Sequence, residues 1–361
     1  MNMRDTVKRA IEFCGPTWIP YSLTAVPDQI ASFSPENAAK MEWMRAALRD
    51  QEAEEVGGAL RALPILTPVF PKESSLPEPF RPLVGDEWVD EWGVIWETPD
   101  FPHVSGHPLE EGWNTLDRLV IPDPRAPGRY DHIPQLYADR PDGYRLGHVW
   151  FTHFERLWFL RGFNNTLMDP YTHPKQFAEL QNRLIAFSLE EIEEHLKLDV
   201  DGIFFSDDWG TQTGLLMNPD DWRKWFKPQY KRIFDAVHAG GAHVWMHLCG
   251  NVRTIVPDLI EVGLDVLNPI QPMAMDVDEL AANFGGKVCF YGGADVQGTL
   301  PHGSAQDVED EVKHLIEIFG CYNGGYIGST SHTILPETPP ENIVALFRAF
   351  RENSGWLDVS K

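Results

Sequence analysis

The chain has 361 residues, of which 43% are hydrophobic and 23% are charged, a composition typical of one or two folded domains. Its net charge of −24 argues against a nucleic-acid partner, because phosphate binding depends on clustered Lys and Arg. We find no apolar run near the roughly 20 residues that cross a bilayer, and no signal-peptide core at the N-terminus. These features, with four scattered cysteines, favour a cytoplasmic enzyme without disulfides.

The first 140 residues predict an irregular N-terminal extension rather than a separate domain. Four elements are expected in it: a helix over residues 4–13, a short strand over 18–23, a helix that begins after a possible N-cap at Ser34, and a strand and loop over 88–96. Turn signals rich in Pro and Gly occupy much of the remainder. The extension therefore lacks a regular repeat.

From about residue 145 onward, strand and helix patterns alternate. Strands are expected over residues 146–152, 202–208, 243–249, 266–271, 288–293 and 325–329. Helices are expected over residues 174–196, 220–238, 254–262, 278–284, 304–319 and 340–351. Repeated strand–helix units are typical of a parallel α/β fold. Length and spacing favour a (β/α)8 TIM-type barrel with an irregular N-terminal extension, in one domain over residues 1–361; a doubly wound open sheet is the main alternative.

Side chains that can ligate a metal, transfer a proton or bind a substrate follow many of these strands. They are His153, Glu155, Asp207, Asp208, His247, Cys249, Gln271, Asp295 and His332. Barrel active sites lie at the C-terminal ends of the strands, so the sequence predicts that these side chains gather at one mouth.

The most distinctive pair in this set is His247 and Cys249. Side chains two residues apart on a strand project the same way, about 7 Å apart along the backbone. An imidazole nitrogen and a thiolate in that arrangement can converge on one zinc ion. The alternative is structural, with Cys249 as a buried thiol and His247 as a hydrogen-bonded core histidine.

Five sequence blocks carry a resemblance to a known family. They are Asp90-Glu91-Trp92-Gly93-Val94, Asp207-Asp208-Trp209-Gly210 with Asn218-Pro219, His247-Leu248-Cys249-Gly250-Asn251, Tyr291-Gly292-Gly293-Ala294-Asp295, and Gly325-Tyr326-Ile327 with Pro339-Pro340-Glu341-Asn342-Ile343. In this order they resemble the uroporphyrinogen decarboxylase superfamily, which also contains zinc-dependent methyltransferases that serve corrinoid proteins or coenzyme M. The resemblance implies a TIM-type barrel that is often a homodimer.

Two chemistries compete within that superfamily. The decarboxylases use an arginine-rich N-terminal segment and no metal, whereas residues 14–23 of this chain contain no arginine. The methyltransferases hold zinc with a His-x-Cys pair and a later cysteine. His247 and Cys249 match the pair, but His332 stands near the later position. The resemblance therefore implies His332 either as a substituted third ligand or as a decarboxylase-like polar residue.

Two histidines and one cysteine would leave a fourth zinc position open, as expected of a catalytic site. A zinc ion with one thiolate fewer is a stronger Lewis acid, which favours demethylation of a small methoxylated or methylamine-type compound. The methyl group would pass to cobalamin carried by a partner corrinoid protein. The alternatives are a metal-free decarboxylase or lyase of a small carboxylate, and a non-catalytic ligand-binding barrel.

Further roles are assigned by residue type. Catalytic roles are expected for Asp207, Asp208 and Glu155, and substrate contacts for Arg156, Trp209, Gln271, Tyr291 and Asp295. Either aspartate is a candidate fourth ligand, general acid or partner of His247. Their alternative roles are helix capping and ion pairing at the rim, and Trp209 is alternatively a packing residue.

Overall fold

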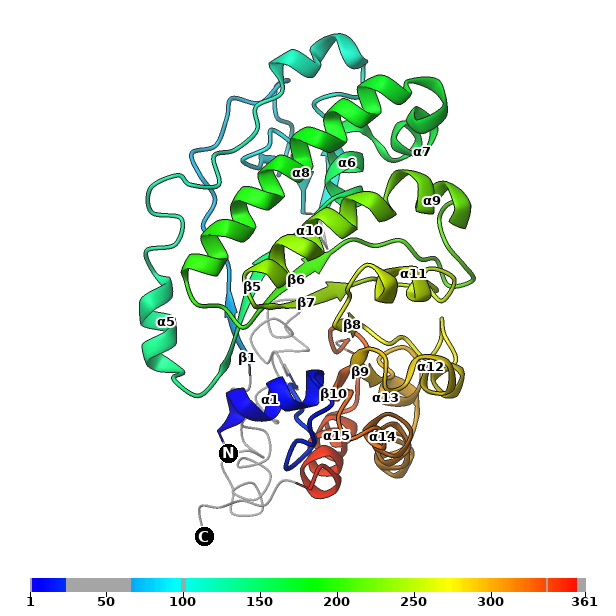
Figure 1. Ribbon diagram of the computed structural model, residues 1–361. Helices are drawn as coiled ribbons and strands as arrows, with labels where there is room; N and C mark the ends of the chain where they lie inside the picture. The colour runs from blue at the N-terminus through cyan, green and yellow to red at the C-terminus, as the bar shows by residue number, and fades with distance from the viewer. Residues whose placement is uncertain (1, 24–65, 99–101, 336, 356–361) are drawn as a thin grey trace.

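The computed structural model describes residues 2–23, 66–98, 102–335 and 337–355, and its centre is a curled parallel sheet (Figure 1). Seven strands lie side by side in the order β1-β5-β6-β7-β8-β9-β10. Their bounds are β1 (Leu66–Val69), β5 (Tyr144–Val149), β6 (Gly202–Ser206), β7 (His243–His247), β8 (Val266–Asn268), β9 (Cys289–Ala294) and β10 (Tyr326–Thr330). Each strand pairs in parallel with its neighbour, which confirms the parallel α/β class.

The N-terminal segment extends this sheet beyond β10. Tyr21 forms a parallel bridge with Gly328, and the Ser22 N–H donates to the Gly328 carbonyl oxygen at 2.8 Å. The strand expected over residues 18–23 is thus reduced to a single bridge. The described residues form a half-barrel of seven strands plus this bridge, and they do not show the closed eight-stranded barrel that the sequence predicts.

Helices connect the strands in the expected order. The larger ones are α1 (Met3–Ile11), α6 (Phe154–Arg161), α7 (Phe163–Thr172), α8 (Pro174–Lys197), α9 (Pro219–Trp225), α10 (Lys227–Ala239), α11 (Val256–Glu261), α12 (Val277–Phe284), α14 (Ala305–Gly320) and α15 (Pro340–Asn353), and α13 (Thr299–His302) is a single turn. Figure 1 shows α8 and α10 running along one side of the sheet, and α1 lies against β5 and β10.

One helix prediction was wrong in its continuity. The segment over residues 220–238 forms two helices, α9 and α10, which meet at Phe226. Pro228 in the first turn of α10 explains the break, since its ring nitrogen has no hydrogen to continue the α9 ladder. The sequence prediction also omitted α6 and α7, which place Glu155 and Arg156 on a helix.

The N-terminal extension is more ordered than its sequence suggests. Strand β1 joins the main sheet, and a separate antiparallel sheet contains β2 (Trp88–Val89), β3 (Ile95–Glu97) and β4 (His103–Gly106). A 3-10 helix, η1 (Trp113–Arg118), and a short helix, α5 (Ile133–Asp139), lead to β5. The helix expected after Ser34 lies outside the described residues. No helix among the described residues is long and apolar enough to cross a bilayer.

The strands are largely buried, and the polar candidate residues follow them at one edge of the sheet. Strands β6, β8 and β10 are buried along their whole length, as expected for parallel strands covered on both faces. The strands expected over 202–208, 243–249 and 266–271 ran past the observed ends, so Asp207, Cys249 and Gln271 lie in loops directly after β6, β7 and β8. These loops emerge at the C-terminal edge of the sheet, where the candidate site forms.

Candidate active site

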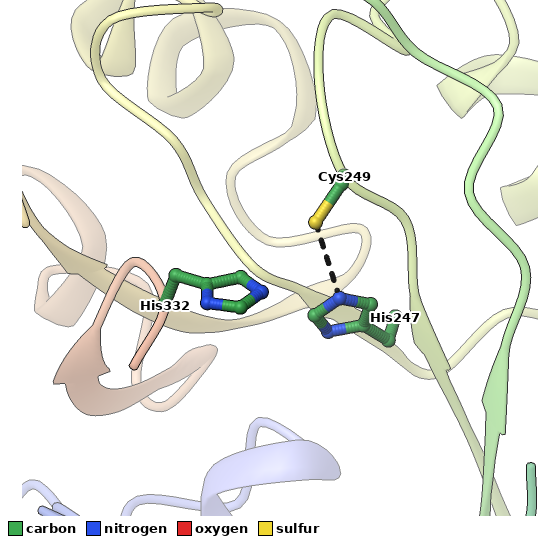
Figure 2. A group of neighbouring side chains, drawn as sticks. All are labelled: His247, Cys249 and His332. Carbon is green, nitrogen blue, oxygen red and sulfur yellow. Dashed lines mark hydrogen bonds between the residues drawn. The ribbon is translucent and has the colours of Figure 1, made fainter. Parts of the chain in front are cut away.

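His247, Cys249 and His332 come together at this edge (Figure 2). His247 is the last residue of β7, Cys249 follows two residues later, and His332 lies in the loop after β10. One potential ligand atom from each residue lies within 4.8 Å of the other two. The His247 Nε2 atom is 3.2 Å from the Cys249 sulfur. Two imidazole nitrogens and one thiol at this spacing are a donor set that suits zinc.

Two hydrogen bonds in series fix the orientation of the His247 ring. Its Nδ1 atom is 2.7 Å from the Asn268 side-chain oxygen, and the Asn268 amide nitrogen donates to the Tyr291 carbonyl oxygen at 3.0 Å. Because Asn268 must donate to Tyr291, its oxygen is the atom that faces His247, so Nδ1 carries the hydrogen. The Nε2 lone pair is then directed at Cys249, as in histidines that ligate metals.

The loop that carries Cys249 is held by close backbone contact. A Cβ atom at Gly250, where φ is +78°, would lie 2.3 Å from the Gly210 carbonyl carbon. The Gly250 N–H donates to the side-chain oxygen of Gln271, and the Cys249 N–H donates to Asp208 Oδ1 at 2.8 Å. Two glycines let the loops after β6 and β7 cross, and that crossing positions Asp208 beside the cluster.

The electrostatics of the cluster leave a role for a positive ion. Burial, together with Asp208 and Glu155, raises the pKa of the Cys249 thiol well above its usual range. Burial and then the neighbouring His247 lower the pKa of His332, so this imidazole is in its neutral, ligating form. A zinc ion would supply the positive charge that converts the thiol to a thiolate. The three side chains therefore fit a zinc ion by donor type, spacing and charge.

The two adjacent aspartates have separate roles. Asp207 is buried and accepts hydrogen bonds from the Phe154 and Glu155 N–H groups, at 2.9 and 2.6 Å, and from the Tyr230 hydroxyl. It therefore holds the first turn of α6. Asp208 is half-exposed, and its Oδ1 lies 3.8 Å from His247 Nε2. Of the pair, Asp208 is the one that lies at the cluster.

Glu155 is a buried carboxyl group beside these aspartates. The Ser206 hydroxyl donates to its Oε2 at 2.8 Å. Burial, reinforced by Asp208 and Asp207, raises the pKa of Glu155 to about 9. Glu155 consequently holds a proton at neutral pH and can act as a donor.

The structure places the expected substrate-contact residues in different surroundings. Tyr291 lines a hollow next to the cluster, together with Trp150, Phe204, His247, Asn268 and His332, which we call the His332 hollow. Trp209 was expected at an aromatic mouth but is fully buried, with its ring 3.9 Å from that of Phe154 and its N–H donating to Tyr230. Its size and its need for a hydrogen-bond partner are both met in the core.

The remaining three contact candidates also have defined partners. Gln271 accepts from the Gly250 N–H and so supports the ligand loop. Asp295 is buried and accepts from the Gln297 N–H at 2.9 Å, within its own turn. Arg156 lines a second cavity, on the β1–β5 side of the mouth.

Two residues important to the geometry were missed by the sequence prediction. Asn268 was assigned only to the strand over 266–271, although an amide at the end of an otherwise apolar strand, next to the His247 strand, is a usable signal. Trp150, which lines the His332 hollow, carries no comparable signal because an aromatic residue after a strand is common.

Comparison with known proteins agrees with this architecture. The model of the family "Uroporphyrinogen decarboxylase (URO-D)" matches residues 102–353, which is more than half of the chain. The chain belongs to the uroporphyrinogen decarboxylase family. The block resemblance drawn from the sequence is thereby confirmed.

Relatives within the uroporphyrinogen decarboxylase family are distant. A "Uroporphyrinogen decarboxylase" of Chloroherpeton thalassium is 23% identical over 251 residues, which cover 66% of this chain and 69% of that protein. One from Chlorobium chlorochromatii is 22% identical over 189 residues, or 52% of this chain and 50% of that protein. The chain thus spans about half the length of some curated relatives that it matches.

A solved structure supports the fold over its whole length. A "methyltransferase from Methanosarcina mazei" aligns with a TM-score of 0.66 and 17% identity, and covers 98% of this chain and 99% of that one. At this identity the likeness shows a shared fold. The likeness assigns no activity to this chain, so the choice of chemistry depends on the site.

Proposed function

We propose that this chain is a zinc-dependent methyltransferase, which demethylates a small methoxylated or methylamine-type substrate and passes the methyl group to a corrinoid protein. The observation that carries the proposal is the cluster of His247, Cys249 and His332, whose ligand atoms lie within 4.8 Å of one another. The hydrogen bond from His247 Nδ1 to Asn268 supports it, because that contact leaves Nε2 free to ligate.

In this proposal the three residues hold zinc and leave one position open to the substrate. Zinc supplies Lewis acidity, which draws electron density from the substrate heteroatom that carries the methyl group. Removing a methyl group from an oxygen leaves that oxygen in need of a proton, while the electron pair for the new carbon–cobalt bond comes from reduced cobalt. Glu155, which holds a proton at neutral pH, is the proposed donor. Asp208 lies near His247, and we propose that it orients the groups at the open coordination position.

The partners follow from the same proposal. Cobalamin would be carried by a separate corrinoid protein that docks at the C-terminal mouth, and the enzyme would be a homodimer, as the family resemblance implies. Tyr291 is proposed to contact the substrate from the wall of the His332 hollow.

Metal content and methyl transfer test the proposal together. We expect one zinc per chain by mass spectrometry, and formation of methylcobalamin from reduced cobalamin and a methylated substrate, followed by absorbance. His247→Ala and Cys249→Ala should lose zinc and more than about 100-fold in rate, since the ligands themselves matter more than their supporting partners. Cys321→Ala, at an exposed thiol, is the matched control and should change neither measurement. A metal-free protein that keeps its activity would overturn the proposal.

A second function is favoured by the names of the curated relatives, which are decarboxylases. In that case the metal-free protein would release carbon dioxide from a small carboxylate, and Cys249→Ala would leave the rate unchanged. Measuring carbon dioxide release on the same preparations distinguishes the two chemistries.

A further inference from the structure

A second cavity opens at the same mouth, on the β1–β5 side. It has a volume of about 260 Å³ and lies against the residues that follow β1 and β5. Much of its wall is aromatic, from Phe70, Trp92, Trp150, Phe151 and Phe187. The metal proposal does not use this cavity, which we call the Glu191 cavity after the buried acid on α8 that lines it.

Two arginines beside the cavity are already matched by acids. Arg129 donates to both carboxylate oxygens of Glu91, at 2.6 and 3.2 Å. Arg156 lies 4.6 Å above the Trp92 ring and donates to Asp90 at 3.4 Å. Each positive charge therefore has a negative partner, and the two pairs leave no net charge.

Two further carboxylates remain after that pairing. Glu191 is only 5% exposed, and its one described contact is with Arg129, at 3.5 Å, an arginine that Glu91 already neutralises. Glu73 lines the rim of the cavity and has no ion pair among the residues that the structure describes. A buried carboxylate without a full partner is costly, and a cation in the cavity would remove that cost.

The cavity adjoins the candidate metal centre. Trp150 lines both the Glu191 cavity and the His332 hollow, and its ring centre is 6.1 Å from that of His247. A compound bound in the cavity would thus be separated from the cluster by one indole ring. Aromatic faces attract organic cations strongly, and they also accept the alkyl groups that inorganic cations lack.

We propose that the Glu191 cavity binds the organic ammonium group of the substrate, with Glu191 and Glu73 facing its charge and the aromatic wall facing its alkyl groups. The assignment rests on the proposed function and deepens it: the substrate carries an ammonium group in the Glu191 cavity, on the far side of Trp150 from the methylated heteroatom at the cluster. Glu191 then acts in substrate binding, away from the methyl transfer itself.

Three compounds of one shape and different charge test the charge preference. Choline is positive, 3,3-dimethyl-1-butanol is neutral and 3,3-dimethylbutyrate is negative. We would titrate each into the metal-free full chain by calorimetry at pH 8, where Glu191 is ionised. Choline should bind at least about tenfold more tightly than the alcohol, as a cation over aromatic rings and a carboxylate predicts. Equal affinity for the alcohol, or tighter binding of the butyrate through Arg156, would overturn the proposal.

Substitutions then locate the binding. Glu191→Gln removes the charge but keeps the shape, and it should weaken choline at least about tenfold. Glu190→Gln is the matched control, since the neighbouring Glu190 is half-exposed and pairs with Arg125 at 2.8 Å; it should leave choline binding unchanged. Glu73→Gln, at an exposed position, should weaken binding and serves if Glu191→Gln does not fold. Unchanged binding in both Glu73→Gln and Glu191→Gln would refute the site.

The two proposals fail in different ways. His247→Ala should lose zinc and still bind choline, because the Glu191 cavity lies on the other side of Trp150. Loss of the charge preference with intact zinc would remove only the substrate assignment. Absence of zinc with intact choline binding would remove the methyltransferase proposal and leave an ammonium-binding site.

Discussion

The β7–β10 side of the mouth and its β1–β5 side both contain buried polar groups, but those groups are supported differently. The direction of the His247 ring is fixed by a neutral amide, because Asn268 contacts Nδ1 and donates in turn to the Tyr291 carbonyl oxygen. Around Glu191 the partners are arginines shared with other acids, and above its pKa of about 7 Glu191 adds a negative charge that those arginines do not neutralise. Fixed direction suits a metal ion, which requires lone pairs at set angles, whereas unbalanced charge in an aromatic cavity suits an organic cation.

The largest effect that separates the two sides concerns pH. Burial raises the pKa of Glu191 from 4.5 to about 7. The folded chain therefore keeps this proton, while the unfolded chain loses it, between pH 4.5 and 7, so stability falls as pH rises through that window. Glu191→Gln should reduce the fall by on the order of 3 kcal/mol, while the part of the fall that comes from Glu155 remains. Urea unfolding at pH 5 and pH 8 measures it, with Glu190→Gln as control; parallel losses in all three proteins would contradict it.

The crossing of the loops after β6 and β7, beside His247 and Cys249, should give the next largest effect. Gly250→Ala puts a Cβ atom 2.3 Å from the Gly210 backbone, at a φ of +78°. We expect a loss of about 2 kcal/mol in the free energy of unfolding, together with weaker zinc binding.

Gly241→Ala separates the two causes of that loss. Gly241 has nearly the same φ, +76°, but nothing lies within 4 Å of its Cβ position. Chemical denaturation of both variants should show the smaller loss in Gly241→Ala. Equal losses would mean that backbone strain alone explains the effect, and that the crossing of the loops adds nothing.

The smallest effect concerns the partner of His247. Asn268→Ala removes the acceptor for Nδ1, and zinc affinity, measured by competition with a chelator, should fall about tenfold. Asn268→Asp keeps an acceptor at that position and should keep most of the affinity. If the alanine variant binds zinc as tightly as the wild type, the ring is held by some other contact.

The sequence predicted that His247, Cys249 and His332 lie together, because each of them ends or follows a strand. The alternation over residues 243–249 places His247 and Cys249 on one face, and parallel strands bring His332 to the same edge. The order of the six strands after residue 145 was also correct, whereas α6 and α7 were omitted and α9 and α10 were expected as one helix. Each of these features depends on local periodicity and on the rule that such strands end at a common edge.

The Glu191 cavity could not be predicted from the sequence in the same way. Glu73, Arg129 and Glu191 come from two loops and a long helix, and only the folded chain brings them together. An acid on a helix is usually solvated, so Glu191 gave no sign of burial. Trp209 shows the opposite error. A large aromatic residue beside two aspartates was expected at the mouth of the site, but its ring is buried in the core against Phe154.

The bridge between Tyr21 and Gly328 has a consequence for how the chain folds. It joins segments separated by 307 residues, and the Ser329 hydroxyl bonds to the Ser22 carbonyl across the same gap. Contacts at this separation form late, because a long loop must close before they contribute. During synthesis the segment around Tyr21 is made 307 residues before its partner and cannot pair until β10 has emerged. This segment therefore stays open to other chains while the sheet is being built, which makes it the point where misassembly would begin.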